Sequence, residues 1–182
     1  MGIPTLISTS TASDSSSVAI TSGIDSTYDE YMFVFTDIGP ATEDAIFQWQ
    51  SSIDGGSNYN VTVTSTFFRA YHAEDNAAAA VAYETGSDLA QQTTYQGITE
   101  AVGMSNAADA SLGGVLHLFS PASTTYVKHW YCRANMMVLT DNTYSVDAFS
   151  AGYFNDTNDI DAVSFKMSSG NFDGVIQMYG IA

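Results

Sequence analysis

The stretch Val61-Thr62-Val63-Thr64-Ser65-Thr66-Phe67 alternates apolar and hydroxyl-bearing side chains over its first four positions and ends on an aromatic ring. Successive side chains of an extended chain point to opposite sides, so Val61, Val63 and Phe67 share one face and the three threonines share the other. This pattern predicts a strand with one dry face and one wet face.

The same alternation recurs in both directions along the chain. Upstream it involves Tyr31, Phe33 and Phe35, and downstream it involves Val163, Phe165 and Met167. Segments that favour turns separate these runs, and they are Asp54-Gly55-Gly56-Ser57, Gly39-Pro40, Asp141-Asn142 and Ser169-Gly170-Asn171. We therefore expect about nine to eleven strands. The predicted fold class is all-β, a single-domain antiparallel β-sandwich or jelly roll.

Two segments depart from the strand pattern. Residues 1–17 include a polar low-complexity stretch and are expected to form an N-terminal arm or a lead-in to the first strand, with the jelly-roll domain spanning residues 18–182. Residues 73–110 are rich in Ala, Gln, Thr and Gly, and we expect a long excursion there. Asp75 or Asn76 would cap a short helix within it that ends before Gly86. The excursion is either a plain surface loop or a loop facing another subunit or a receptor.

Charge and cysteine content exclude several classes of function. The chain has 182 residues, with 4 basic and 20 acidic side chains, a net charge of -16 and one cysteine, Cys132. Nucleic acids and anionic membranes need clustered cations, so neither is an expected partner. No apolar run reaches the roughly 20 residues that cross a bilayer, so we expect no membrane insertion. A single cysteine forms neither an internal disulfide nor a cysteine-based metal site.

Few residues suggest chemistry. His117 and His129 lie in apolar runs, and pairing of those runs would bring the imidazoles together, although no acid lies nearby in either run to complete a metal site. Asp156, Asp159 and Asp161 crowd one short segment and are candidate calcium ligands, against the alternative of a solvated turn. Pairs of carboxylates cannot be selected without geometry. We therefore nominate no catalytic residue and no cofactor-binding residue, and calcium is the one candidate ion.

The segment from Phe47 to Asn60, which reads FQWQSSIDGGSNYN, resembles a hairpin found in many virion proteins of marine bacteriophages. Further stretches that resemble those proteins are Phe68-Arg69-Ala70-Tyr71, residues 123–129, residues 149–153 and residues 162–181. The resemblance covers roughly residues 18–182 and includes no catalytic residue.

This resemblance implies a bacteriophage virion structural protein on the exterior of the particle, made in the host cytoplasm. Such proteins are called decoration, structural or tail-fibre proteins, and those of this size commonly form trimers. The implied partners are copies of the chain itself and the major capsid or tail proteins of the same virion.

Three functions compete at this point. The first is a non-enzymatic capsid decoration (cement) or appendage protein. The second is the receptor-binding head of a tail fibre that recognises a host surface glycan or protein, and a remote third is a glycan depolymerase. The last predicted strand, with Val175, Ile176, Met178 and Tyr179, is apolar on both faces, which is typical of a central strand or of a strand facing a neighbouring subunit.

Overall fold

The computed structural model describes residues 2–139 and 143–182, which contain twelve strands and no helix. The strands are β1 (Thr5–Ser15), β2 (Val18–Ile20), β3 (Glu30–Pro40), β4 (Phe47–Ser52), β5 (Val63–Ala73), β6 (Ala79–Tyr83), β7 (Gln96–Gly97), β8 (Leu112–Phe119), β9 (Lys128–Leu139), β10 (Thr143–Phe154), β11 (Ala162–Met167) and β12 (Phe172–Ile181). The same residues include no helix with the length and hydropathy that a membrane span requires.

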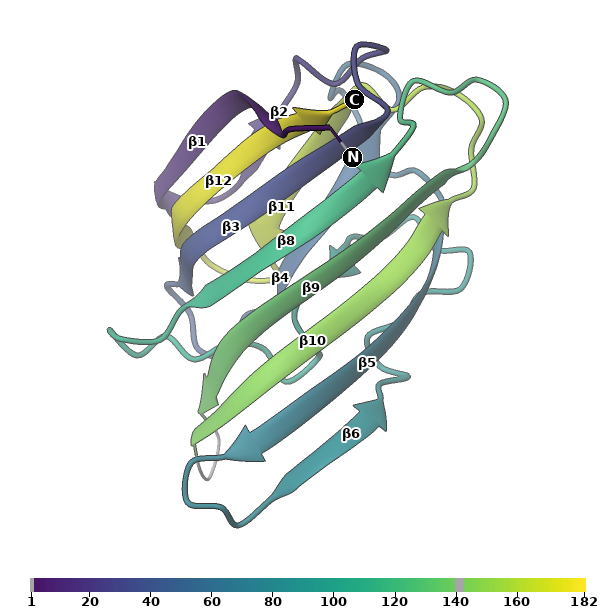
Figure 1. Ribbon diagram of the computed structural model, residues 1–182. Coiled ribbons are helices and arrows are strands. Elements are labelled where there is room, and N and C mark those ends of the chain that lie inside the picture. The colour runs from purple at the N-terminus through teal and green to yellow at the C-terminus, as the bar shows by residue number, and fades with distance from the viewer. Residues whose placement is uncertain (1, 140–142) are drawn as a thin grey trace.

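The strands form two antiparallel sheets that pack face to face (Figure 1). The large sheet has eight strands in the order β1-β12-β3-β8-β9-β10-β5-β6, and the small sheet has four in the order β2-β11-β4-β7. The predicted all-β sandwich is therefore confirmed. The jelly roll stays a prediction, since the two sheets are unequal in size and their strand order does not by itself identify that topology.

Aromatic side chains fill the space between the sheets. Phe165 of the small sheet lies with its ring centroid 5.6 Å from Phe33 and 5.3 Å from Phe35 of the large sheet. Trp49 of β4 contacts Trp130 of β9 at 5.2 Å, edge to face. The alternation in the sequence correctly predicts the core positions of Phe33, Phe35 and Phe165, because alternate residues of an extended strand share one face.

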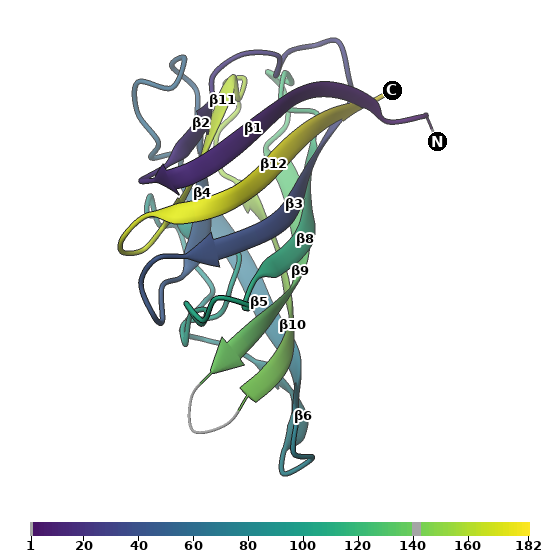
Figure 2. The same ribbon diagram turned by 90° about the vertical axis from the view of Figure 1, so that its left-hand side faces the viewer.

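The large sheet extends past the small one. In the view of Figure 2, β6 and the neighbouring ends of β9, β10 and β5 project below the body of the sandwich. We call this part of the large sheet the overhang. Its inner face is not covered by a strand of the small sheet, and loops lie against it instead.

The polar N-terminal segment is a strand rather than an arm or a lead-in. Residues 5–15 form β1, which pairs with β12 at one edge of the large sheet. Its burial pattern shows a single buried residue, Ala12, so both faces of this edge strand are largely wet. A strand without a buried face carries no alternation of apolar residues, so the sequence pattern did not identify residues 5–15 as a strand.

The alanine-rich run also forms a strand, and the predicted helix is wrong. Residues 79–83 form β6, which pairs with β5 through the registers Tyr71↔Ala80 and Phe68↔Tyr83. Backbone pairing at the sheet edge overrides the high helix propensity of alanine. The rest of the 73–110 excursion contains β7 and loops that close the overhang.

The predicted turns have mixed outcomes. Gly55, Gly56 and Gly170 have φ of 70°, 82° and 71°, as expected of turn glycines. The Gly39-Pro40 turn is misplaced, because both residues end β3, where they pair with Asp173 and Phe172. The predicted turn at 141–142 lies outside the described residues.

Candidate functional site

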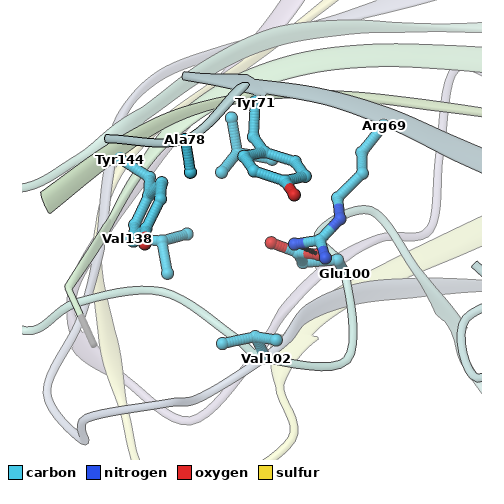
Figure 3. A pocket seen from close by; sticks show the side chains of 8 residues that line it. Arg69, Tyr71, Ala78, Glu100, Val102, Val138 and Tyr144 are labelled. Atoms are coloured by element: carbon cyan, nitrogen blue, oxygen red, sulfur yellow. Dashed lines mark ion pairs between the residues drawn. The ribbon is translucent and has the colours of Figure 1, made fainter. Parts of the chain in front are cut away.

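A cavity of about 240 Å³ lies under the overhang (Figure 3). Strands β5, β9 and β10 provide one wall, and the loop that follows β7 provides the other. Its lining residues are Arg69, Tyr71, Ala78, Glu100, Val102, Val138, Tyr144 and Val146. Three of them, Ala78, Glu100 and Val102, belong to the 73–110 excursion.

Backbone bonds to β4 hold the loop that carries Glu100. The N–H of Ile98 donates to the carbonyl of Phe47 at 2.7 Å, and the N–H of Phe47 donates to Thr99 Oγ1 at 3.1 Å. The loop then turns at Gly103, whose φ is 83°. The Asp44 backbone lies so close to Gly103 that the Cβ of any other residue would collide with it. These contacts fix Glu100 against the inner face of β5.

An ion-pair network occupies one side of the cavity. Glu100 is only 1% exposed, and its carboxylate contacts Nη1 of Arg69. Arg69 Nε also donates to Glu84 Oε1 at 2.7 Å, and the guanidinium carbon lies 4.8 Å from the Tyr71 ring centroid. Burial raises the pKa of the Glu100 carboxyl, and the positive charge of Arg69 opposes that rise.

The rest of the cavity is apolar and aromatic. Val102, Val138 and Val146 line it, together with the rings of Tyr71 and Tyr144, whose centroids are 5.9 Å apart in an edge-to-face arrangement. Such a mixture of apolar walls and a few polar groups is typical of a small-ligand pocket. The carboxylates of Glu84 and Glu100 pair with the same guanidinium.

The two histidines do not meet. Strands β8 and β9 do pair, but His117 lies opposite Tyr131, and His129 lies opposite Tyr153 of β10. His117 Nδ1 contacts the carboxylate of Glu30, from β3, and its ring stacks on Tyr131 at 4.6 Å. Among the described residues no three His, Cys, Asp or Glu side chains converge as metal ligands would.

The three candidate calcium ligands do not converge on one point. Asp156 Oδ1 accepts the backbone N–H of Asn158 at 2.8 Å. Both carboxylate oxygens of Asp161 accept the N–H of Gly55, at 3.0 and 2.9 Å. Asp159 is exposed. The segment surrounds the buried ammonium group of Lys128, which donates to the carbonyls of Asp156 at 3.2 Å and Asn158 at 2.5 Å.

Burial of Lys128 has two effects. It lowers the pKa of the ammonium group, and the carboxylates of Asp156 and Asp159 oppose that shift. The charged ammonium group also binds two backbone carbonyls of this segment, and carbonyl oxygens are among the ligands that calcium prefers. The positive charge inside this acidic segment comes from a lysine 28 residues before Asp156.

We expect millimolar calcium to leave the thermal midpoint of the protein unchanged relative to magnesium, because the Lys128 charge repels a second cation at this position. Replacing Lys128 with methionine should lower the free energy of unfolding by about 1–2 kcal/mol, since two partly buried carbonyls lose their charged donor. Thermal and urea unfolding of both proteins, with either ion, check this. A calcium-specific rise in the wild-type midpoint would contradict it.

Aromatic side chains also cross the outer face of the large sheet, which the sequence analysis did not anticipate. We call them the outer aromatic row, and its members are Phe119, His117, Tyr131, Phe149, Phe68 and Tyr83. They come from β8, β9, β10, β5 and β6. The available signal was the pair Phe67-Phe68, because adjacent strand residues face opposite sides and only one of the two can join the core.

The rings of the row stack on one another. Phe68 and Phe149 have centroids 5.0 Å apart and planes at 21°, and His117 and Tyr131 have centroids 4.6 Å apart and planes at 19°. At such separations parallel rings overlap face to face with an offset. Part of each flat ring face therefore contacts a neighbouring ring.

The last strand, β12, is a central strand that pairs with both β1 and β3. Ile176 and Met178 are fully buried in the core, whereas Val175 and Tyr179 are partly exposed on the outer face. That outer face is the only side of β12 open to a neighbouring subunit.

No protein-family model, curated protein or solved structure matches this chain. The site must therefore be interpreted from its own geometry.

Proposed function

We propose that this protein is a non-enzymatic structural component of the exterior of a bacteriophage particle, a capsid decoration protein or an appendage protein. The observation that carries the proposal is the outer aromatic row, an apolar band across five strands of a chain whose net charge is -16. Exposed apolar surface on an otherwise acidic protein marks a contact surface. In a decoration protein such a band would contact neighbouring subunits.

The residues that carry the resemblance to phage virion proteins have structural roles here. Asp54 Oδ1 accepts the hydroxyl of Ser52 at 2.7 Å and the N–H of Asn58 at 2.9 Å. Gly55 is tied to Asp161, as described above. The motif thus builds a hydrogen-bonded corner between β4 and the following loop, which agrees with a scaffold role and supplies no catalytic group.

The copy number per particle tests this proposal. Quantitative mass spectrometry of purified particles of the encoding phage should find this protein in copy numbers comparable with the capsid subunits, because decoration proteins cover the shell. The major capsid protein of the same sample serves as the internal standard. Copy numbers of only a few to a few tens would exclude decoration, and absence from the particle would exclude a virion role altogether.

A second candidate is the receptor-binding head of a tail fibre, and the cavity under the overhang favours it. This cavity is built partly from the 73–110 excursion, with a polar side and apolar walls. Adsorption of the purified protein to host cells, and competition with infection, would support this candidate. The depolymerase alternative has less support, because the one carboxylate among the lining residues, Glu100, is paired with Arg69. Release of reducing ends from host glycan tests it.

A further inference from the structure

Strand β6 is the open edge of the large sheet. The bonds Ala73 N–H to Ala78 O and Glu84 N–H to Phe67 O frame the ladder that joins β6 to β5. Hydrogen-bonded pairs alternate in an antiparallel ladder, so Ala80 and Ala82 also bond toward β5. The backbone N–H and C=O groups of Ala79, Val81 and Tyr83 consequently point away from the sheet, where none of the described strands lies.

This edge lacks the features that keep edge strands apart. Residues 76–82 contain no charged side chain and no proline, and Val81 is 76% exposed. The opposite edge, β1, is interrupted by two register shifts, between Leu6 and Ser8 and between Ala12 and Ser15. In the small sheet the edge strands β2 and β7 have only three and two residues. Among the described strands, β6 is the one edge fit for regular pairing.

The occupant that fits this edge is a second copy of the chain. Two copies repel each other over most of their surface because each has a net charge of -16. Along β6 they can approach without bringing like-charged side chains together, because residues 76–82 carry no charge. Glu84, next to the strand, is already paired with Arg69. The side chains are also self-complementary, because a two-fold axis at Val81 places Ala79 opposite Tyr83 of the other copy.

We propose that two copies pair antiparallel through β6, around a two-fold axis at Val81, and join their large sheets into one continuous sheet. Each of Ala79, Val81 and Tyr83 then exchanges both of its outward backbone groups with the other copy. Val81 and Tyr83 share the outer face with Phe68, which is 43% exposed, so the pairing also extends the outer aromatic row.

The inference rests on the part of the proposed function in which copies associate. It concerns a contact different from a three-fold axis, so the trimer implied by the resemblance would become a hexamer. The two ideas fail separately. If the purified protein forms even-numbered assemblies but is absent from phage particles, the β6 contact stands and the virion role is refuted. If the protein is abundant in particles but does not pair through β6, the virion role stands and the contact is refuted.

Substitutions at Val81 test the contact. Proline there removes an N–H that points outward and leaves the bonds to β5 intact, and lysine places like charges opposite each other. We expect both variants to weaken self-association roughly tenfold or more, whereas Val81→Thr keeps it. Sedimentation velocity gives the masses, and thermal unfolding shows that the variants fold. Wild-type protein that stays monomeric or strictly trimeric, or Val81→Pro and Val81→Lys assemblies of wild-type mass, would overturn the proposal.

Thiol cross-linking locates the axis. Cys132 is buried, so a cysteine introduced at the edge is the only accessible thiol among the described residues. Val81→Cys faces its own copy across the axis, and mild oxidation should give disulfide-linked dimers, since directly opposed residues lie within the reach of a disulfide and diagonal neighbours do not. Ala80→Cys is the matched control, because its side chain lies on the inner face and opposes Ala82 of the other copy. Equal yields from the two variants, or none from Val81→Cys, would contradict this geometry.

Discussion

Replacing Trp49 with alanine is expected to lower the free energy of unfolding by about 3–5 kcal/mol, the range for removing a large aromatic side chain from a core. Trp49 is fully buried at the centre of the sandwich. It contacts Trp130 at 5.2 Å and Phe154 at 5.1 Å in the large sheet, and it stacks with Phe165 at 6.4 Å in its own sheet. The cavity left behind would remove the packing contacts between the two sheets at this point.

Urea unfolding followed by circular dichroism measures this loss. A domain of this kind has about 5–15 kcal/mol of stability, so Trp49→Phe, which keeps an aromatic ring, provides a milder variant if the alanine protein does not fold. Tyr126→Ala is the control, because Tyr126 is 72% exposed and its loss should change stability by no more than about 0.5 kcal/mol. Equal effects at positions 49 and 126 would mean that the aromatic core does not hold the sheets together.

Much of the core of this fold can be predicted from the sequence because its apolar residues recur at every second position. Phe33 and Phe35 alternate with the less buried Met32 and Val34, so a period of two marks them directly. Val163 and Phe165 alternate in the sequence with polar residues, although the structure buries Ala162 and Ser164 as well. The turn glycines at 55, 56 and 170 carry an equally local signal, since their conformation depends on the absence of a side chain.

The edges of the large sheet could not be predicted in the same way. Strand β1 is polar on both faces, and strand β6 is made largely of alanine, which favours helix in isolation. Both become strands only because β12 and β5 offer them a backbone ladder. Tertiary pairing of this sort leaves no trace in local composition.

The candidate site was hidden for a related reason. Arg69 and Glu100 are far apart in the sequence, and only the anchoring of the loop on β4 brings them together. The acidic segment at 156–161 is conspicuous in the sequence, yet nothing there reveals that its backbone carbonyls bind the ammonium group of Lys128, which belongs to β9. A cluster of charges in a sequence shows which groups need a partner but not where the partner comes from.

Replacing Arg69 with methionine should lower the free energy of unfolding at neutral pH by about 2–4 kcal/mol. Removing one member of a buried ion pair leaves the other charge uncompensated, which costs about 3–5 kcal/mol when both groups are buried. The smaller range applies here because the Arg69 side chain is 22% exposed and partly screened by water. Glu84 also loses its partner, but its side chain is 26% exposed and remains solvated.

The pH dependence of this loss separates charge from packing. Without Arg69, burial and the nearby negative charge of Glu84 both act on Glu100, and the pKa of its carboxyl rises further above the ordinary value of 4.5. The folded variant then binds a proton more readily than the unfolded chain, so its stability falls as the pH rises from that ordinary value through the raised one. The difference between wild type and Arg69→Met should therefore be larger at about pH 8 than at about pH 5.5.

The double variant Arg69→Met with Glu100→Gln is the control for this interpretation. It removes the buried charge together with its partner, so it should be more stable than Arg69→Met alone at about pH 8 and should lose the extra pH dependence. Urea unfolding at the two pH values gives all the required free energies. If the single and double variants lose the same stability at both pH values, the charge of Glu100 is not what Arg69 compensates, and the guanidinium stabilises this protein through the contacts that both variants lack, its stacking on Tyr71 and its pair with Glu84.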